Sequence, residues 1–137
     1  MAADQYHHIV KAHRPVGYKL IERPMTANYG LTTFQRTISC EPIVDRAALF
    51  IFLHECGHVH LGHLRKNRGL PIWRQEYEAD QYAIAAFQAL KLPMPRERLQ
   101  DCKTVMHDYI LEGQHRHEEI DEEVLKYAYG KNWRHHR

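Results

Sequence analysis

The sequence lacks the features typical of membrane proteins, disulfide scaffolds and proteins that bind nucleic acid by charge alone. Its 137 residues include only three cysteines, with no Cys-x-x-Cys pair, which argues against a disulfide framework. The longest uninterrupted apolar run, Ala47 to Leu53, is far shorter than the ~18 residues of a membrane span. Lys and Arg total 19 and Asp and Glu total 17, so no strong charge of one sign is present to bind a phosphate backbone.

Other absences concern targeting and domain organisation. The start, Met1-Ala2-Ala3-Asp4, has neither the basic region nor the apolar region of a secretory signal peptide. With the odd cysteine count, this leads us to expect a protein of the reducing cytoplasm. The sequence has no internal repeat and no Ser/Gly-rich linker, and its length suits one hydrophobic core. We therefore expect a single domain over residues 1–137.

The hydrophobic pattern predicts short strands followed by helices. Three β-prone runs, at 16–21, 29–34 and 36–40, predict a small antiparallel sheet. Helices are predicted at about 43–61, 72–90, 95–113 and 118–129, with Gly62 and the 67–71 stretch ending the first and Gly113 ending the third. The first helix is apolar nearly all round, so it should form the buried centre. The expected fold is α+β, with the sheet packed on a helical core.

The predicted central helix carries an H-E-x-x-H motif, His54-Glu55-Cys56-Gly57-His58. Residues four apart on a helix advance about 400°, so both imidazoles share one face and can reach one ion. Zinc suits two such nitrogens, an oxygen ligand and an open fourth position. Glu55 is one step further round and can take a proton from a metal-bound water, which is the geometry of a zinc hydrolase.

A third ligand is expected on the next predicted helix, in the pattern Glu76-Tyr77-Glu78-Ala79-Asp80. One loop separates the two helices, so they can pack antiparallel and present Glu76 to the same ion. Asp80 lies four residues after Glu76 and shares its face, whereas Glu78 lies on a different face and is expected to be a solvated charge. The rival third ligand is His63, which on a continuous helix would lie about 500° from His58 and off the metal face.

These motifs resemble those of the gluzincin metallopeptidases. The likeness covers about residues 29–93 and is greatest to the compact ImmA/IrrE-like and minigluzincin proteins, through the segment 76–83 and the nearby Leu92-Pro93. It implies a zincin-like fold, with Zn²⁺ held by His54, His58 and Glu76, Glu55 as the general base, and Asp80 supporting a ligand histidine. An aliphatic residue usually stands at the position of Cys56, and we find no room for a DNA-binding helix-turn-helix domain. These departures argue against a repressor-cleaving role.

The predicted function is zinc-dependent hydrolysis of peptide bonds in a protein or peptide substrate, by an endopeptidase. The alternative is a catalytically idle zinc-binding module with a regulatory or interaction role. Glu55 discriminates between the two, because a structural zinc site has no use for a base beside the metal. Sequence alone names neither the substrate nor the oligomeric state.

Several further expectations concern the surroundings of this site. The strand at 36–40 directly precedes the motif helix and can border the cleft, where an extended peptide could pair with it. Cys56 should be a small buried filler, and the basic tail around Trp133 should be frayed rather than a nucleic-acid-binding element. A peptidase also needs a donor for the oxyanion. The candidates are Tyr82, His107, Tyr109, His115 and His117.

Overall fold

The computed structural model describes residues 4–25, 30–65 and 69–137. The predicted strand residue Tyr29 and part of the predicted 67–71 helix stop lie outside the described residues. The first part of the chain contains the α-helix α1 and the three strands β1, β2 and β3. The elements of that part are η1 (Asp4–Tyr6), α1 (His7–His13), β1 (Lys19–Glu22), β2 (Leu31–Thr32) and β3 (Thr37–Cys40). The second part is helical: α2 (Arg46–His60), α3 (Ile72–Ala89), α4 (Arg96–His115), α5 (Glu122–Tyr129) and η2 (Gly130–His136).

The α+β class is confirmed, but the sheet is mixed rather than antiparallel. Its strand order is β1-β3-β2, with β2 antiparallel and β1 parallel to β3. A tight turn joins β2 to β3 and reverses the chain, so those two strands must be antiparallel. Strand β1 lies on the other side of β3 and runs parallel to it. The connection from β1 that makes this possible has no signal in the local sequence pattern. Strand β3 is therefore central, with β1 and β2 at the two edges, which corrects the expectation that 36–40 borders the cleft.

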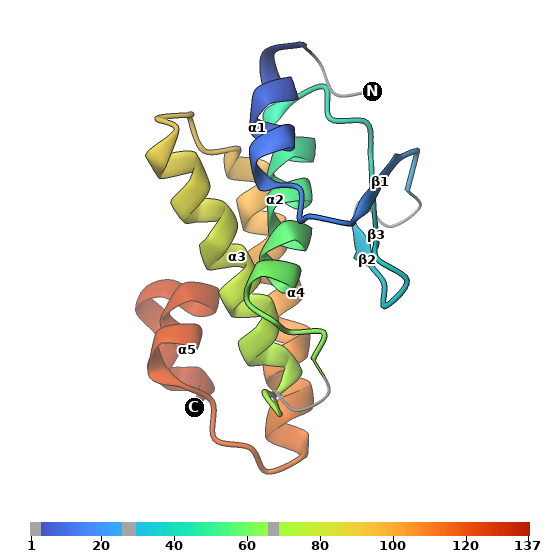
Figure 1. Cartoon of the computed structure of the whole chain (residues 1–137). Coiled ribbons are helices and arrows are strands. Elements are labelled where there is room, and N and C mark those ends of the chain that lie inside the picture. The colour runs from blue at the N-terminus through green and yellow to red at the C-terminus, as the bar shows by residue number, and fades with distance from the viewer. Residues whose placement is uncertain (1–3, 26–29, 66–68) are drawn as a thin grey trace.

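Helix α2 lies between the sheet and the other helices, as Figure 1 shows. It begins at Arg46 because the Asp45 side chain accepts a hydrogen bond from the Ala48 backbone N–H at 2.8 Å. Eight of its residues from Leu49 to Gly57 are buried, so the predicted central position is confirmed. Cys56 is fully buried, as expected of a filler. None of the helices in the described residues is long and apolar enough to span a membrane.

A glycine permits the close approach of α2 and α3. A Cβ added at Gly57 would lie 2.9 Å from the Cβ of Tyr82 and 3.3 Å from the Cα of Ala79. No side chain larger than hydrogen fits there without moving helix α3. The contact lies one turn from His54 and, on α3, one turn from Glu76, so it brings the ligand-bearing turns of the two helices together.

The apolar side chains form two clusters. The α2 core contains Ile38, Phe50, Phe52, Leu53 and Phe87 together with ten other buried residues from the first part of the chain and from α2 and α3. The C-terminal core lies around α4, α5 and η2. Its buried members are Trp73, Met106, Ile110, Ile120, Val124, Leu125, Ala128 and Trp133.

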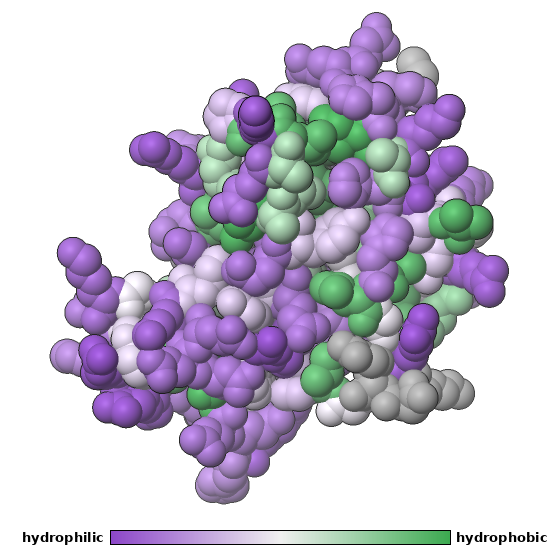
Figure 2. All heavy atoms as spheres, turned by 60° about the vertical axis from the view of Figure 1, so that its left-hand side comes forward, coloured by the Kyte–Doolittle hydropathy of each residue, from purple (hydrophilic) through white to green (hydrophobic). Residues whose placement is uncertain are grey.

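The C-terminal core corrects three expectations. Helix α4 continues past Gly113 to His115, and the glycine serves close packing instead, since a Cβ there would come within 2.7 Å of Trp73 Cδ1. The chain then reverses through His117, which has a positive φ of 63°, so α5 begins at Glu122 rather than 118. The tail is not frayed: Trp133 is 7% exposed, and Arg134 and Arg137 lie over its ring. Figure 2 shows apolar atoms gathered in the upper half of one face and a largely hydrophilic lower half.

Candidate active site

Two imidazole nitrogens and one carboxylate meet between α2 and α3. The Nε2 atoms of His54 and His58 are 3.1 Å apart. The Glu76 carboxylate lies 3.3 Å from His54 Nε2 through Oε1 and 2.8 Å from His58 Nε2 through Oε2. The structure thus brings together the three residues that the H-E-x-x-H motif and the E-x-x-A-D pattern predicted as metal ligands.

This donor set fits a zinc ion. With ligand bonds of about 2.0–2.1 Å, tetrahedral neighbours lie about 3.3 Å apart, close to the separations observed here. Both Nδ1 atoms are engaged elsewhere, so each histidine directs only Nε2 at the common point. The three acidic or basic groups of the motif, His54, Glu55 and His58, also lie close enough to hold an ion together. A donor set of two imidazoles and one carboxylate is one that zinc commonly binds.

Asp80 contacts the first histidine from behind. Its Oδ1 lies 2.7 Å from His54 Nδ1, and its Oδ2 accepts a hydrogen bond from the Tyr127 hydroxyl at 2.8 Å. Asp80 is 2% exposed, so both oxygens are held by protein groups rather than by bulk water. The structure places Asp80 where the sequence predicted it, but Tyr127 on α5 was missed because 47 residues separate the pair.

Glu55 is oriented by the edge strand. Its Oε1 accepts a hydrogen bond from the Thr32 hydroxyl at 2.7 Å, while its Oε2 lies 3.8 Å from His54 Nε2. The backbone at Gly30 passes directly over this side chain, where a Cβ would approach Glu55 Cγ to 2.4 Å. Thr32 and Gly30 therefore fix which carboxylate oxygen faces the histidines. Sequence analysis found Glu55 but had no signal for Thr32.

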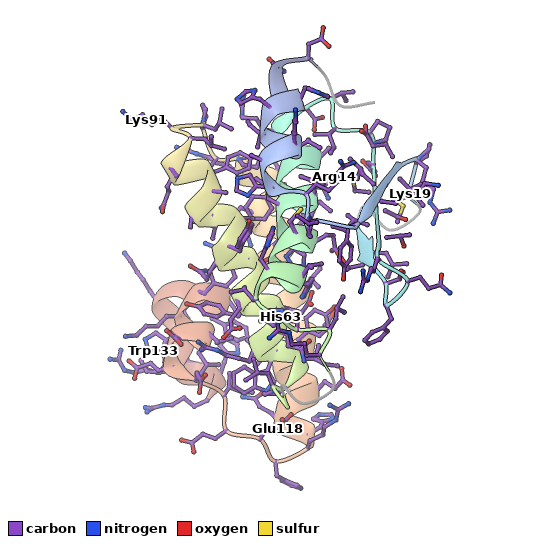
Figure 3. All side chains as sticks on the ribbon, viewed as in Figure 1. Arg14, Lys19, His63, Lys91, Glu118 and Trp133 are labelled. Carbon is purple, nitrogen blue, oxygen red and sulfur yellow. The ribbon has the colours of Figure 1, made fainter. Side chains whose placement is uncertain are left out.

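His63 takes a place that the sequence analysis did not foresee. It lies just beyond the end of α2 (Figure 3), with Nδ1 2.9 Å from His58 Nδ1 and Nε2 2.8 Å from Glu78 Oε1. Glu78 also accepts a hydrogen bond from Arg74 Nε at 3.0 Å. The expectation that Glu78 is a solvated charge is therefore wrong. Because Glu78 is two residues from Glu76 on the helix, its side chain points away from the two Nε2 atoms and the Glu76 carboxylate, and toward His63.

The electrostatics of the site favour positive charge next to the carboxylates of Glu76, Glu78 and Asp80. Burial lowers the pKa of His54, but hydrogen bonds to Asp80 and Glu76 outweigh this and raise it well above its ordinary value. Burial raises the pKa of Glu76, but the two histidines outweigh that effect and hold it well below its usual range. Burial likewise acts to raise the pKa of Glu78, and His63 and Arg74 lower it on balance. A cation is the partner that these surroundings favour.

Two hollows open on either side of the site. One, of about 210 Å³, reaches toward α4 and is lined in part by Ile51, Cys102, Val105, Met106 and Tyr109. The other, of about 270 Å³, runs beside β2 and is lined in part by Leu31, Thr32, His63, Leu64 and Gln75. Both hollows share Gly30, Glu55 and Glu76. The two hollows therefore adjoin at the Glu55–Glu76 pair.

The hollow toward α4 also distinguishes between the five candidate oxyanion donors. Of the five, only Tyr109 lines the hollow that contains His54 and Glu76. The Tyr82 hydroxyl is 2.8 Å from His13 Nδ1, and His107 Nε2 is 2.8 Å from the Ala128 carbonyl oxygen, so both are engaged elsewhere. The other two candidates, His115 and His117, are exposed at the end of α4.

Comparison with known proteins gives a family. The sequence model of the family described as Peptidase U49 matches residues 12–91. That stretch is more than half of the chain, contains His54, Glu55, His58, Glu76 and Asp80, and ends before α4. Searches of curated proteins and of solved structures return no significant match. The chain therefore belongs to the Peptidase U49 family. Membership of a peptidase family implies that it acts on proteins, and the clustered histidines agree with this.

Proposed function

We propose that the chain is a zinc-dependent endopeptidase of the gluzincin type. The observation that carries this proposal is the convergence of His54 Nε2, His58 Nε2 and the Glu76 carboxylate, with the Glu55 carboxylate beside them. In this proposal the first three residues hold zinc. A zinc ion held there would supply Lewis-acid activation of water and of the substrate carbonyl.

Glu55 is the general base in this proposal. The Thr32 hydroxyl holds Oε1, so Oε2 is the oxygen that faces the histidines and can accept a proton. The same carboxyl group can return that proton to the leaving amine. Glu55 is only 7% exposed and stands beside the proposed ligands, where a structural zinc site has no use for a base. Its position therefore favours the peptidase over an idle zinc module.

The substrate is proposed to be an extended segment of a protein. Strand β2 is the edge of the sheet that lies at the site, because it carries Thr32 directly beside Glu55. An extended chain can add to that edge by main-chain hydrogen bonds. The hollows on both sides of the Glu55–Glu76 pair leave space for residues before and after the cleaved bond, which suits an endopeptidase. Tyr109 is the proposed oxyanion donor. The three free cysteines agree with a reducing compartment such as the cytoplasm.

The proposal is tested by Glu55→Gln. The variant should bind zinc as tightly as the parent chain, because Gln matches the shape and the ligands remain. It should lose cleavage of an unfolded protein substrate, because an amide cannot accept the proton. Glu112→Gln, on the exposed side of α4, is the matched control and should cleave normally.

Two results would contradict the proposed function. Loss of zinc in Glu55→Gln would make Glu55 a ligand rather than a base. A parent chain that holds zinc but cleaves nothing across a broad peptide library would indicate the idle module instead.

A further inference from the structure

We infer that His63 and Glu78 are positioning residues for His58, and that Arg74 ties this pair to helix α5. The inference rests on the proposed function, since it concerns how a proposed zinc ligand is held. Its basis is an unbroken series of contacts: His58 Nδ1 to His63 Nδ1 at 2.9 Å, His63 Nε2 to Glu78 Oε1 at 2.8 Å, and Glu78 Oε2 to Arg74 Nε at 3.0 Å.

The end of α2 explains how His63 reaches His58. Helix α2 ends at His60, and Gly62 adopts a left-handed conformation with φ of 73°. The His63 backbone N–H donates to the His58 carbonyl oxygen at 2.9 Å, and the Gly62 N–H donates to the Val59 carbonyl oxygen at 3.0 Å. This pair of bonds is a Schellman motif, which folds the residue after the glycine back over the helix. The 500° separation expected on a continuous helix therefore does not apply.

The direction of the hydrogen bonds follows from the carboxylate. The Glu78 carboxylate can only accept, so His63 Nε2 carries the proton of that bond. With His63 in its neutral form, the single N–H is the one on Nε2, and Nδ1 is left as an acceptor. His58 Nδ1 must then be the donor in the bond between the two rings. This arrangement selects the His58 tautomer whose Nε2 has a lone pair directed at Glu76 and His54.

The far end of the series lies on α5. Arg74 Nη1 donates to Asp121 Oδ2 at 3.0 Å and also contacts Glu123. The first histidine is held in a parallel way, by Tyr127 of α5 through Asp80. The His63 side chain is 1% exposed, so water has little access to replace these contacts. Helix α5 therefore anchors the hydrogen bonds behind both histidines, although it lies outside the family match.

The test compares zinc affinities by chelator competition. His63→Phe should weaken zinc binding about 10–100-fold, the usual cost of removing a partner of a ligand histidine. His63→Asn should recover much of that loss, because its Oδ1 can accept from His58 Nδ1. The zinc affinity of Glu78→Ala should lie between those of His63→Phe and His63→Asn. His60→Phe is the matched control: this exposed histidine of α2 bonds the His13 carbonyl oxygen and should leave the affinity unchanged.

A second readout does not depend on cleavage or on any variant folding. In the ¹⁵N-labelled zinc-loaded chain, a scalar coupling between the two Nδ1 nuclei should be detected, with the proton bonded to His58. A proton bonded to His63 Nδ1 would overturn the inference. So would equal zinc affinity of the parent chain and folded His63→Phe.

Failure of the proposed function is distinguishable from failure of this inference. A parent chain that binds zinc, shows the coupling and cleaves nothing would contradict the peptidase and support the positioning role. A parent chain that binds no zinc would overturn both.

Discussion

The α2 core and the C-terminal core contribute to the site in different ways. The α2 core carries the groups that converge, because His54 and His58 lie on α2 and α3 packs against it through Gly57. The C-terminal core carries groups that hold them: Tyr127 contacts Asp80, and Asp121 contacts Arg74. The family match covers the first set and stops before the second. The matched part of the chain therefore carries the converging groups and their immediate partners, and only the far end of each hydrogen-bond series lies beyond it.

The largest expected effect comes from separating α2 from α3. In Gly57→Leu the new side chain collides with the Ala79 backbone and the Tyr82 side chain, so Glu76 should move away from both histidines. We expect loss of stoichiometric zinc and a fall of about 3 kcal/mol in the free energy of unfolding. Metal analysis after dialysis and chemical denaturation measure the two effects. Ala85→Leu, at an exposed position of α3, should change neither.

The next effect concerns the C-terminal core alone. Trp133→Ala removes a buried indole and should lower the free energy of unfolding by about 3 kcal/mol. The three converging residues are untouched, so the folded variant should still bind one zinc ion. Denaturation of the metal-free protein and zinc titration separate the two properties. A change below about 0.5 kcal/mol, the level of an ordinary surface substitution, would mean that the tail does not belong to the folded core.

A smaller effect tests the link between the two cores. Tyr127→Phe removes one hydroxyl and leaves Asp80 Oδ2 without that donor, so zinc affinity should fall about tenfold. The unfolding free energy should change by about 1 kcal/mol, the usual value of one hydrogen bond. Tyr129→Phe is the matched control, because the Tyr129 ring stacks on His107 and His136 away from the site. Equal zinc affinity in both variants would show that α5 packs beside the site without supporting it.

The part of the site that sequence predicts is the part set by helical spacing. His54 and His58 are one turn apart, and Glu76 and Asp80 repeat that spacing on the next helix, so their meeting follows from two helices packing together. The predicted helices at about 43–61 and 72–90 agree closely with α2 and α3, except that the Asp45 cap starts α2 at Arg46 and was not used in the prediction. These predictions depend only on residues that lie within about one helical turn of each other in the sequence.

The parts that sequence missed depend on contacts between distant segments. Strand β1 pairs in parallel with β3, and no local sequence pattern predicts the direction of that pairing. Thr32 and Tyr127 reach Glu55 and Asp80 across 23 and 47 residues. His63 was placed on the wrong path because α2 stops at His60 and Gly62 reverses the chain. Gly62 correctly predicted the end of the helix, but the same glycine also folds His63 back over its last turn, and this consequence was missed.

The central claim is most directly tested by anomalous diffraction at the zinc edge from crystals of the zinc-loaded chain. The account predicts one ion, bound by Nε2 of His54, Nε2 of His58 and the Glu76 carboxylate. Glu55 should lie beside the ion and His63 behind His58, with neither bound to it. An ion bound through Glu55 or His63, or located away from these helices, would contradict the account.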